Sequence, residues 1–208
     1  MKQMITLPRL FSLGFFVSSN TDYKVVDDGC IVDEKLKFVV RDNFIDFWIH
    51  DILLREYLKE DYDNSYKTNV KAKMTKWKTE TRGISLISNI IVNELLSSYK
   101  DFGYNLDANN CWFAKYDMGE YTTSHNHLPS AFSFVYFLKS PIGSSPLVFT
   151  NSNVEIEPKE GRLVMFPSVL YHHVPPNNCN ERIVFSGNII DNTTINPEDW
   201  MRGITKFQ

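Results

Sequence analysis

The second half of the chain, from Leu106 onward, alternates short apolar runs with turn-forming residues. The runs are rich in Val, Ile, Phe and Tyr, which favour strands, and each is too short for a helix that buries one face. Turn-forming residues separate them, as at Gly143-Ser144-Ser145 and Pro176-Asn177-Asn178. We predict strands at about 110–117, 130–139, 147–150, 154–157, 162–166, 172–174 and 182–190. Many short strands with regular turns are typical of a jelly roll or barrel.

The first half predicts a helical support layer. Asp42 has the character of an N-cap for a helix over 43–62, in which Phe44, Trp48 and Ile52 recur at four-residue spacing. A second stripe over 83–100 predicts another helix; its apolar members are Ile84, Ile87, Ile91, Leu95 and Tyr99. Two amphipathic helices before a run of strands are expected to pack on one face of a sheet.

Length and composition are consistent with one domain over residues 1–208, and we divide it into an N-terminal part (1–106), a core (107–192) and a tail (193–208). The 22 basic and 25 acidic residues nearly balance, so no overall field for nucleic acid or membranes is expected. Three scattered cysteines favour a reducing, cytoplasmic compartment. The opening 20 residues are read as strand pieces rather than a signal peptide, because Pro8, Arg9 and Gly14 interrupt the apolar run.

Residues 66–82 form a basic segment around Trp77. A solvated loop or edge strand is the preferred interpretation, because lysines on an edge discourage aggregation. A surface for an acidic partner or nucleic acid, or one wall of a substrate groove, remains open.

Four of the five histidines lie in the second half, as the pairs His125/His127 and His172/His173. In an extended strand, side chains alternate faces, so His125 and His127 point the same way. A histidine of the second pair, brought across by a neighbouring strand, would complete a site with three protein ligands and open positions, as in catalytic rather than structural metal sites. Imidazole suits iron, zinc, copper or nickel, so ligand type leaves the metal open.

The last predicted strand carries a charge on an otherwise uncharged face. Arg182, Val184, Ser186 and Asn188 share that face. If it lines the interior, the arginine needs an anionic partner, and a bound carboxylate would provide one. If the face is solvated, the arginine carries no special meaning; the histidine spacing favours the interior.

The run from Trp112 to Asn188 resembles the iron(II)- and 2-oxoglutarate-dependent oxygenases, in particular a branch from marine bacteria and their phages with prolyl-hydroxylase-like spacing. The resemblance is carried by motifs in a fixed order. They are Trp112 and Tyr116, the HxH at 125–127, Ser133 with Tyr136-Phe137-Leu138, Glu160-Gly161 leading to Phe166-Pro167-Ser168 and His172, and Glu181-Arg182 leading to Ser186 and Asn188. It implies a double-stranded β-helix, a jelly-roll and cupin-like fold that is mainly β, with the two helices of the N-terminal half packed on one sheet.

The resemblance also implies roles for individual residues. His125, His127 and His172 would bind Fe(II), with His172 selected over His173 by its phase in the motif, and Arg182 would bind the distal carboxylate of 2-oxoglutarate. Further contacts to the cosubstrate would come from Tyr116, Tyr136, Ser186 and Asn188. One departure is that most of the superfamily has a carboxylate where His127 stands; Asp117 and Glu120 are the nearest alternatives.

The implied reaction is hydroxylation of a C–H bond with O2, releasing succinate and CO2. The substrate would be a protein side chain, a metabolite or a nucleobase, in that order, with no membrane partner, and the oligomeric state is left open. Two alternatives remain: a cupin-like three-histidine metalloenzyme that does not use 2-oxoglutarate, and a catalytically silent phage structural or binding protein of the same fold.

Overall fold

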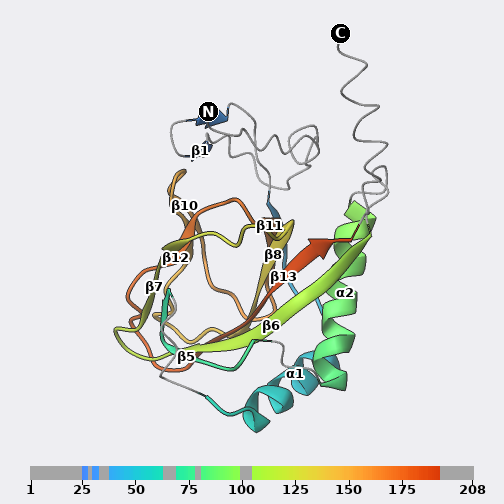
Figure 1. The fold of residues 1–208 in the computed structure, drawn as a ribbon. Helices are drawn as coiled ribbons and strands as arrows, with labels where there is room; N and C mark the ends of the chain where they lie inside the picture. The colour runs from blue at the N-terminus through green and yellow to red at the C-terminus, as the bar shows by residue number, and fades with distance from the viewer. Residues whose placement is uncertain are drawn as a thin grey trace.

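The computed structural model describes residues 25–27, 30–32, 38–62, 69–77, 81–98 and 105–192. Two antiparallel sheets face each other, and two helices cover the outer face of the larger one (Figure 1). This is the mainly β, jelly-roll architecture that the strand pattern predicted. The predictions for the first 24 residues, for Tyr99 and for the tail at 193–208 lie outside the described residues.

The larger sheet has six strands in the order β3-β11-β8-β13-β6-β5. Its strands are β3 (Val39–Arg41), β5 (Lys73–Met74), β6 (Leu106–Tyr116), β8 (Phe132–Lys139), β11 (Leu163–Pro167) and β13 (Arg182–Asp191). Strand β13 is central and pairs with β6 over its whole length, from Arg182 opposite Tyr116 to Asp191 opposite Leu106. That register aligns the inward-facing residues of the two strands in rungs.

The smaller sheet has five strands in the order β10-β9-β12-β7-β4. Its strands are β4 (Val70–Lys71), β7 (Tyr121–His125), β9 (Leu147–Phe149), β10 (Val154–Ile156) and β12 (His172–Val174). A separate hairpin joins β1 (Val25–Asp27) to β2 (Cys30–Val32).

Two apolar cores hold the layers together. One lies between the helices and the larger sheet and includes Leu53, Ile91 and Phe185. The other lies between the two sheets and includes Trp112, Phe137 and Phe166. Because both faces of β8 and β13 are covered, these strands are buried almost throughout.

The helices α1 (Phe47–Lys59) and α2 (Arg82–Ser98) form the predicted support layer. On α2 the predicted stripe is confirmed, since Ile84, Ile87, Ile91 and Leu95 are buried. On α1 the stripe is displaced by one position: Ile49, Leu53 and Tyr57 are buried, whereas Trp48 is 58% exposed.

Helix α1 also begins later than predicted. Asp46, not Asp42, occupies the N-cap position. Asp42 instead binds the guanidinium of Arg162 and the ammonium of Lys159, at 2.6 Å and 2.8 Å. These cations hold the pKa of Asp42 well below its ordinary value, by hydrogen bonds first and charge second.

The basic segment contributes edge strands to both sheets. β4 pairs with β7 and β5 pairs with β6, so residues 70–74 cross from one layer to the other. This confirms the edge-strand interpretation for that part of the segment. Of the helices in the described residues, none is long and apolar enough to cross a membrane.

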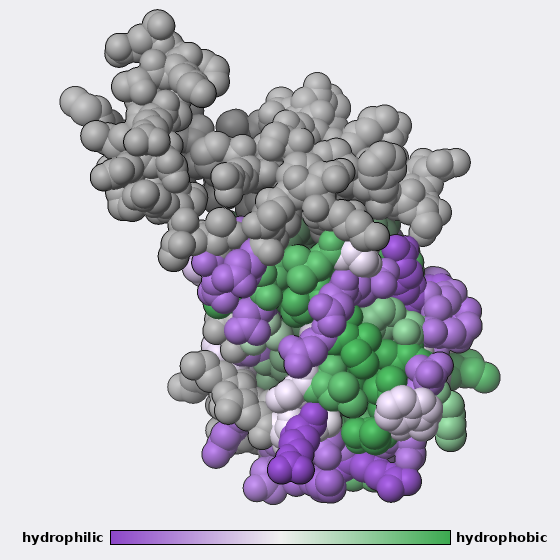
Figure 2. All heavy atoms as spheres, turned by 90° about the vertical axis from the view of Figure 1, so that its right-hand side faces the viewer, coloured by the Kyte–Doolittle hydropathy of each residue, from purple (hydrophilic) through white to green (hydrophobic). Residues whose placement is uncertain are grey.

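On the side of the molecule that carries the helices, apolar residues interrupt the hydrophilic surface (Figure 2). The helices have exposed apolar side chains, among them Phe47, Trp48 and Leu86. The two helices thus carry apolar side chains on the face that packs on the sheet and also on the face exposed to solvent.

Candidate metal and cosubstrate site

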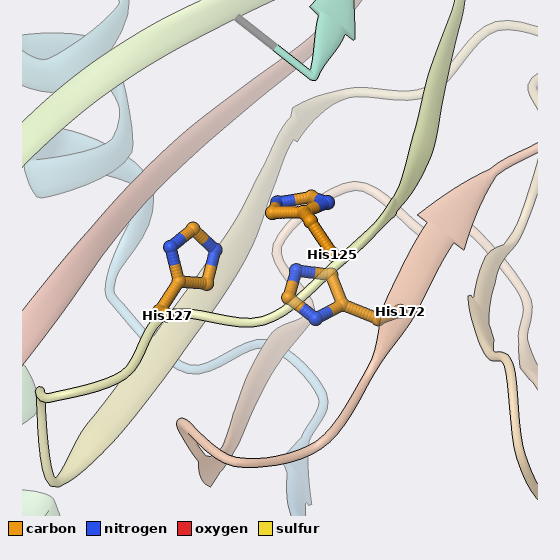
Figure 3. Close-up of side chains that lie close together, drawn as sticks. All are labelled: His125, His127 and His172. Carbon is orange, nitrogen blue, oxygen red and sulfur yellow. The ribbon is translucent and has the colours of Figure 1, made fainter. Parts of the chain in front are cut away.

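Three imidazoles meet between the two sheets. The ligand nitrogens of His125, His127 and His172 all lie within 4.8 Å of one another, and the rings turn toward a common point (Figure 3). Their ring centroids are 4.4 to 5.1 Å apart. Groups at these distances are close enough to bind one metal ion.

Strand pairing accounts for two of the three positions. His172 lies directly opposite His125 in the antiparallel ladder between β12 and β7. Each ring is fixed from behind by a backbone carbonyl: Nδ1 of His125 lies 2.8 Å from the oxygen of Thr123, and Nδ1 of His172 lies 3.0 Å from that of Leu170. A carbonyl can only accept, so the proton is on Nδ1 and Nε2 keeps the lone pair that a metal needs.

His127 reaches the cluster from a loop rather than a strand. β7 ends at His125, and Asn126 then accepts a hydrogen bond from the Leu128 N–H at 3.4 Å, in an Asx-type turn. The His127 N–H donates to the carbonyl of Ser168 at 2.9 Å. The three rings therefore converge as predicted. The position of His127, however, is set by this turn and by the bond to Ser168 and not by strand alternation.

Burial keeps the three imidazoles neutral. It lowers the pKa of His125, lowers that of His172 well below the ordinary value, and lowers the pKa of His127 to about 3; the charge of the neighbouring imidazole adds to the effect on His127 and His172. Since metal binding requires the unprotonated ring, these donors are in the required state at neutral pH.

Arg182 lies in the same cavity as the three histidines. Its side chain is 1% exposed, its Nε donates to the carbonyl of Ser145 at 2.9 Å, and its guanidinium lies over the rings of Tyr116 and Phe137. Nη1 is buried and has no hydrogen-bond partner within the described residues. Burial lowers the pKa of Arg182, but an arginine remains charged. A buried guanidinium with a donor left unsatisfied would be stabilised by an anion.

Tyr116 and Ser186, two of the residues predicted to contact the cosubstrate, lie at the same cavity as Arg182. Both are buried and line it, and the Tyr116 hydroxyl hydrogen-bonds with that of Thr122 at 2.7 Å. Burial raises the pKa of Tyr116, so the phenol is neutral and can donate. Trp112 lies beside them, with its ring centroid 5.8 Å from that of His127.

Comparison with known proteins agrees with this geometry. Residues 148–188 match a family model described as "Putative 2OG-Fe(II) oxygenase", a stretch that includes His172, Arg182 and Ser186. Over these residues the chain is similar to the 2OG-Fe(II) oxygenases.

Solved structures of the same fold include several oxygenases. A viral collagen prolyl hydroxylase from Paramecium bursaria Chlorella virus-1, in complex with 2OG, matches with a TM-score of 0.57 and 19% identity over 73% of this chain and 94% of that one. A prolyl-4-hydroxylase from Pseudomonas putida matches with a TM-score of 0.59 and 19% identity over 74% and 91%. A 2OG-Fe(II) oxygenase family oxidoreductase from Burkholderia pseudomallei matches with a TM-score of 0.61 and 10% identity over 74% and 84%. No curated protein sequence matches.

Two of the residues predicted to contact the cosubstrate lie away from the cavity. Tyr136 is on the opposite face of β8, in the core under the helices, where its hydroxyl lies 2.8 Å from Nδ1 of His50. Asn188 binds Ser133 and Asn110, each at 3.0 Å. The Ser133 hydroxyl in turn hydrogen-bonds with that of Ser168, and the Ser168 carbonyl accepts from the His127 N–H. This series of hydrogen bonds therefore supports the loop that carries His127.

The alternative metal ligands considered from the sequence also lie outside the cavity. Asp117 pairs with Lys73 at 3.2 Å and Lys115 at 3.6 Å, and Glu120 accepts the Asp117 N–H. His173 faces away from the cluster and lies 3.0 Å from the Thr150 hydroxyl. The three-histidine set is thus the metal-ligand cluster found within the described residues.

Sequence reasoning missed the partners that position the site. Ser145 and Ser168 act through backbone carbonyls, which every residue type possesses, so residue identity gives no signal for them. Thr122, the partner of Tyr116, does have a signal, because a hydroxyl beside a predicted ligand strand is a candidate for such a bond.

Proposed function

We propose that this protein is an oxygenase that binds Fe(II) through His125, His127 and His172 and uses it with 2-oxoglutarate to hydroxylate a C–H bond. The observation that carries the proposal is a single cavity that contains three converging neutral imidazoles and a buried arginine with an unpartnered Nη1. Bound iron would supply oxygen activation coupled to the oxidative decarboxylation of 2-oxoglutarate to succinate and CO2.

The protein's own residues have four tasks in this reaction. The histidines hold the ion and leave positions open for other ligands. The planar Arg182 guanidinium binds the distal carboxylate of 2-oxoglutarate with charge-assisted hydrogen bonds. The Tyr116 hydroxyl and Ser186 add neutral donors beside it. The apolar walls, Phe166 among them, exclude water.

The substrate remains at the level of chemical class. Two of the structural neighbours are prolyl hydroxylases, so a C–H bond of a protein side chain is the first class to test. A small metabolite is the second substrate class to test, and a nucleobase is the third.

Anaerobic titration of the purified protein with Fe(II) and then 2-oxoglutarate tests the proposal. We expect a weak visible charge-transfer band that saturates with 2-oxoglutarate, and succinate once O2 is admitted. Metal binding without that band, and with no succinate, would instead support a cupin-like three-histidine enzyme. That second candidate is favoured by the all-histidine ligand set and predicts that Arg182 is dispensable. No binding of iron at all would support the silent structural or binding protein.

A further inference from the structure

The charges in this cavity do not balance when the proposed ligands are present. Three neutral imidazoles add nothing to the two positive charges of a divalent ion. Arg182 adds a third positive charge in the same cavity, and the 2-oxoglutarate dianion offsets two of the three. One positive charge remains in a site whose walls are mainly apolar.

The described residues around the cavity offer no carboxylate to offset it. Among the described residues that line the cavity there is neither Asp nor Glu. The nearest acidic groups in the sequence are engaged outside it: Asp117 with Lys73 and Lys115, and Glu181 with Lys139. The carboxylate of Glu120 accepts the Asp117 N–H in the turn before β7.

An excess charge in a buried apolar site is unfavourable unless a counter-charge enters with it. We propose that the three-histidine centre takes one further monoanionic group beside 2-oxoglutarate, a carboxylate that the primary substrate supplies. This inference rests on the proposed function. It narrows the substrate to molecules with a carboxylate near the reacting C–H bond, such as an acidic side group of a protein, the terminal carboxylate of a peptide or a small organic acid.

The test uses Co(II) as a visible probe in place of Fe(II), without O2. The Co(II) protein is first saturated with 2-oxoglutarate, and then acetate or chloride is added at an ionic strength kept constant with perchlorate. We expect acetate to cause a saturable change in the visible spectrum at lower concentration than chloride. Binding of chloride but not acetate would overturn the assignment to a substrate carboxylate, because a small inorganic anion would then be the partner.

Two variants provide the missing negative charge within the protein. His127→Asp adds it at a ligand, and Ser186→Asp adds it on the cavity wall with all three histidines intact. Each variant is compared at a 2-oxoglutarate concentration that saturates it. Acetate binding should then weaken about tenfold or more, since a like charge in the same partly buried cavity is costly. His173→Asp is the matched control, because it adds the same charge on the face of β12 turned away from the cluster, and it should bind acetate as the wild type does.

The outcomes separate this inference from the function on which it rests. Failure of 2-oxoglutarate to bind the Co(II) protein would overturn the proposed function itself. Normal 2-oxoglutarate binding without any effect of acetate would overturn only the inference. Equal acetate affinity in the wild type and in Ser186→Asp would overturn it as well, even if His127→Asp did not hold the metal.

Discussion

His172 and His125 are direct cross-strand partners, and their ring centroids are 4.4 Å apart. This pairing makes the metal site a property of the β7–β12 ladder, because the strand register itself brings the two rings together. His173, the next residue on β12, faces the other way and hydrogen-bonds Thr150. The two adjacent histidines of β12 are therefore expected to differ sharply when they are replaced.

Replacing His125 or His172 by alanine should lower the affinity for Fe(II) at least about 100-fold, since loss of even a supporting partner costs up to that much. His173→Ala should leave it within about threefold of the wild type. Anaerobic equilibrium dialysis would measure both. A comparable loss in His173→Ala would mean that the ladder does not select the ligand.

Arg182 should have opposite effects on stability and on cosubstrate binding. Arg182→Met removes a buried charge that lacks a full set of partners, so the metal-free protein should be as stable as the wild type or up to about 4 kcal/mol more stable. The same variant should lose about 2–5 kcal/mol of 2-oxoglutarate binding free energy. Urea unfolding and calorimetric titration would measure the two quantities.

Arg182→Lys is the companion variant, because it keeps the positive charge but removes the planar guanidinium that can donate two parallel hydrogen bonds. It should also bind 2-oxoglutarate more weakly than the wild type. Metal-free Arg182→Met that is clearly less stable than the wild type would indicate that the guanidinium already has a structural counter-charge.

Two tyrosines from the same motif set should behave differently. Tyr136→Phe removes a hydrogen bond to His50 in the helix-side core and should cost about 1 kcal/mol of unfolding free energy without changing 2-oxoglutarate affinity. Tyr116→Phe removes a hydroxyl from the cavity and should weaken 2-oxoglutarate binding. The two values come from urea unfolding and from the charge-transfer titration. If only Tyr136→Phe lost affinity for 2-oxoglutarate, Tyr136 and not Tyr116 would be the tyrosine that contacts the cosubstrate.

The stability of the metal-free protein should depend on His127 below pH 6.5. Burial lowers the pKa of folded His127 to about 3 from its ordinary 6.5, so between these values the unfolded state holds a proton that the folded state lacks. The free energy of unfolding should therefore fall as the pH falls through this window and rise as the pH rises. Urea unfolding with a chelator present would follow it, and His127→Gln should have a shallower pH slope, whereas His173→Gln serves as the matched control.

The strand-rich half could be predicted from sequence because turn residues mark where each run ends. The strand predicted at 172–174 is the observed β12, and the one at 182–190 is β13 less its last residue. The face that carries Arg182 and Ser186 was likewise predicted to line the interior, and both residues do line the cavity.

Side-chain direction could not be predicted where both faces of an element are buried. The run around Tyr136 is apolar throughout because β8 lies between two cores, so its sequence contains no alternation that would assign Tyr136 to the helix side. On α1, two stripes of four-residue spacing compete in the sequence, and packing against the sheet selects the one with Ile49, Leu53 and Tyr57. His127 depends on a loop and on a backbone bond to Ser168, neither of which a strand pattern contains.

The histidine cluster belongs to the five-stranded layer and its loop, whereas Arg182 belongs to the six-stranded layer that faces it. A ligand that binds the histidine cluster and Arg182 at the same time would connect the two sheets. Its binding free energy would then add directly to the resistance of the whole sandwich to heat, by mass action. We therefore expect the metal ion and 2-oxoglutarate together to raise the melting temperature by much more than the sum of the increases that each causes alone.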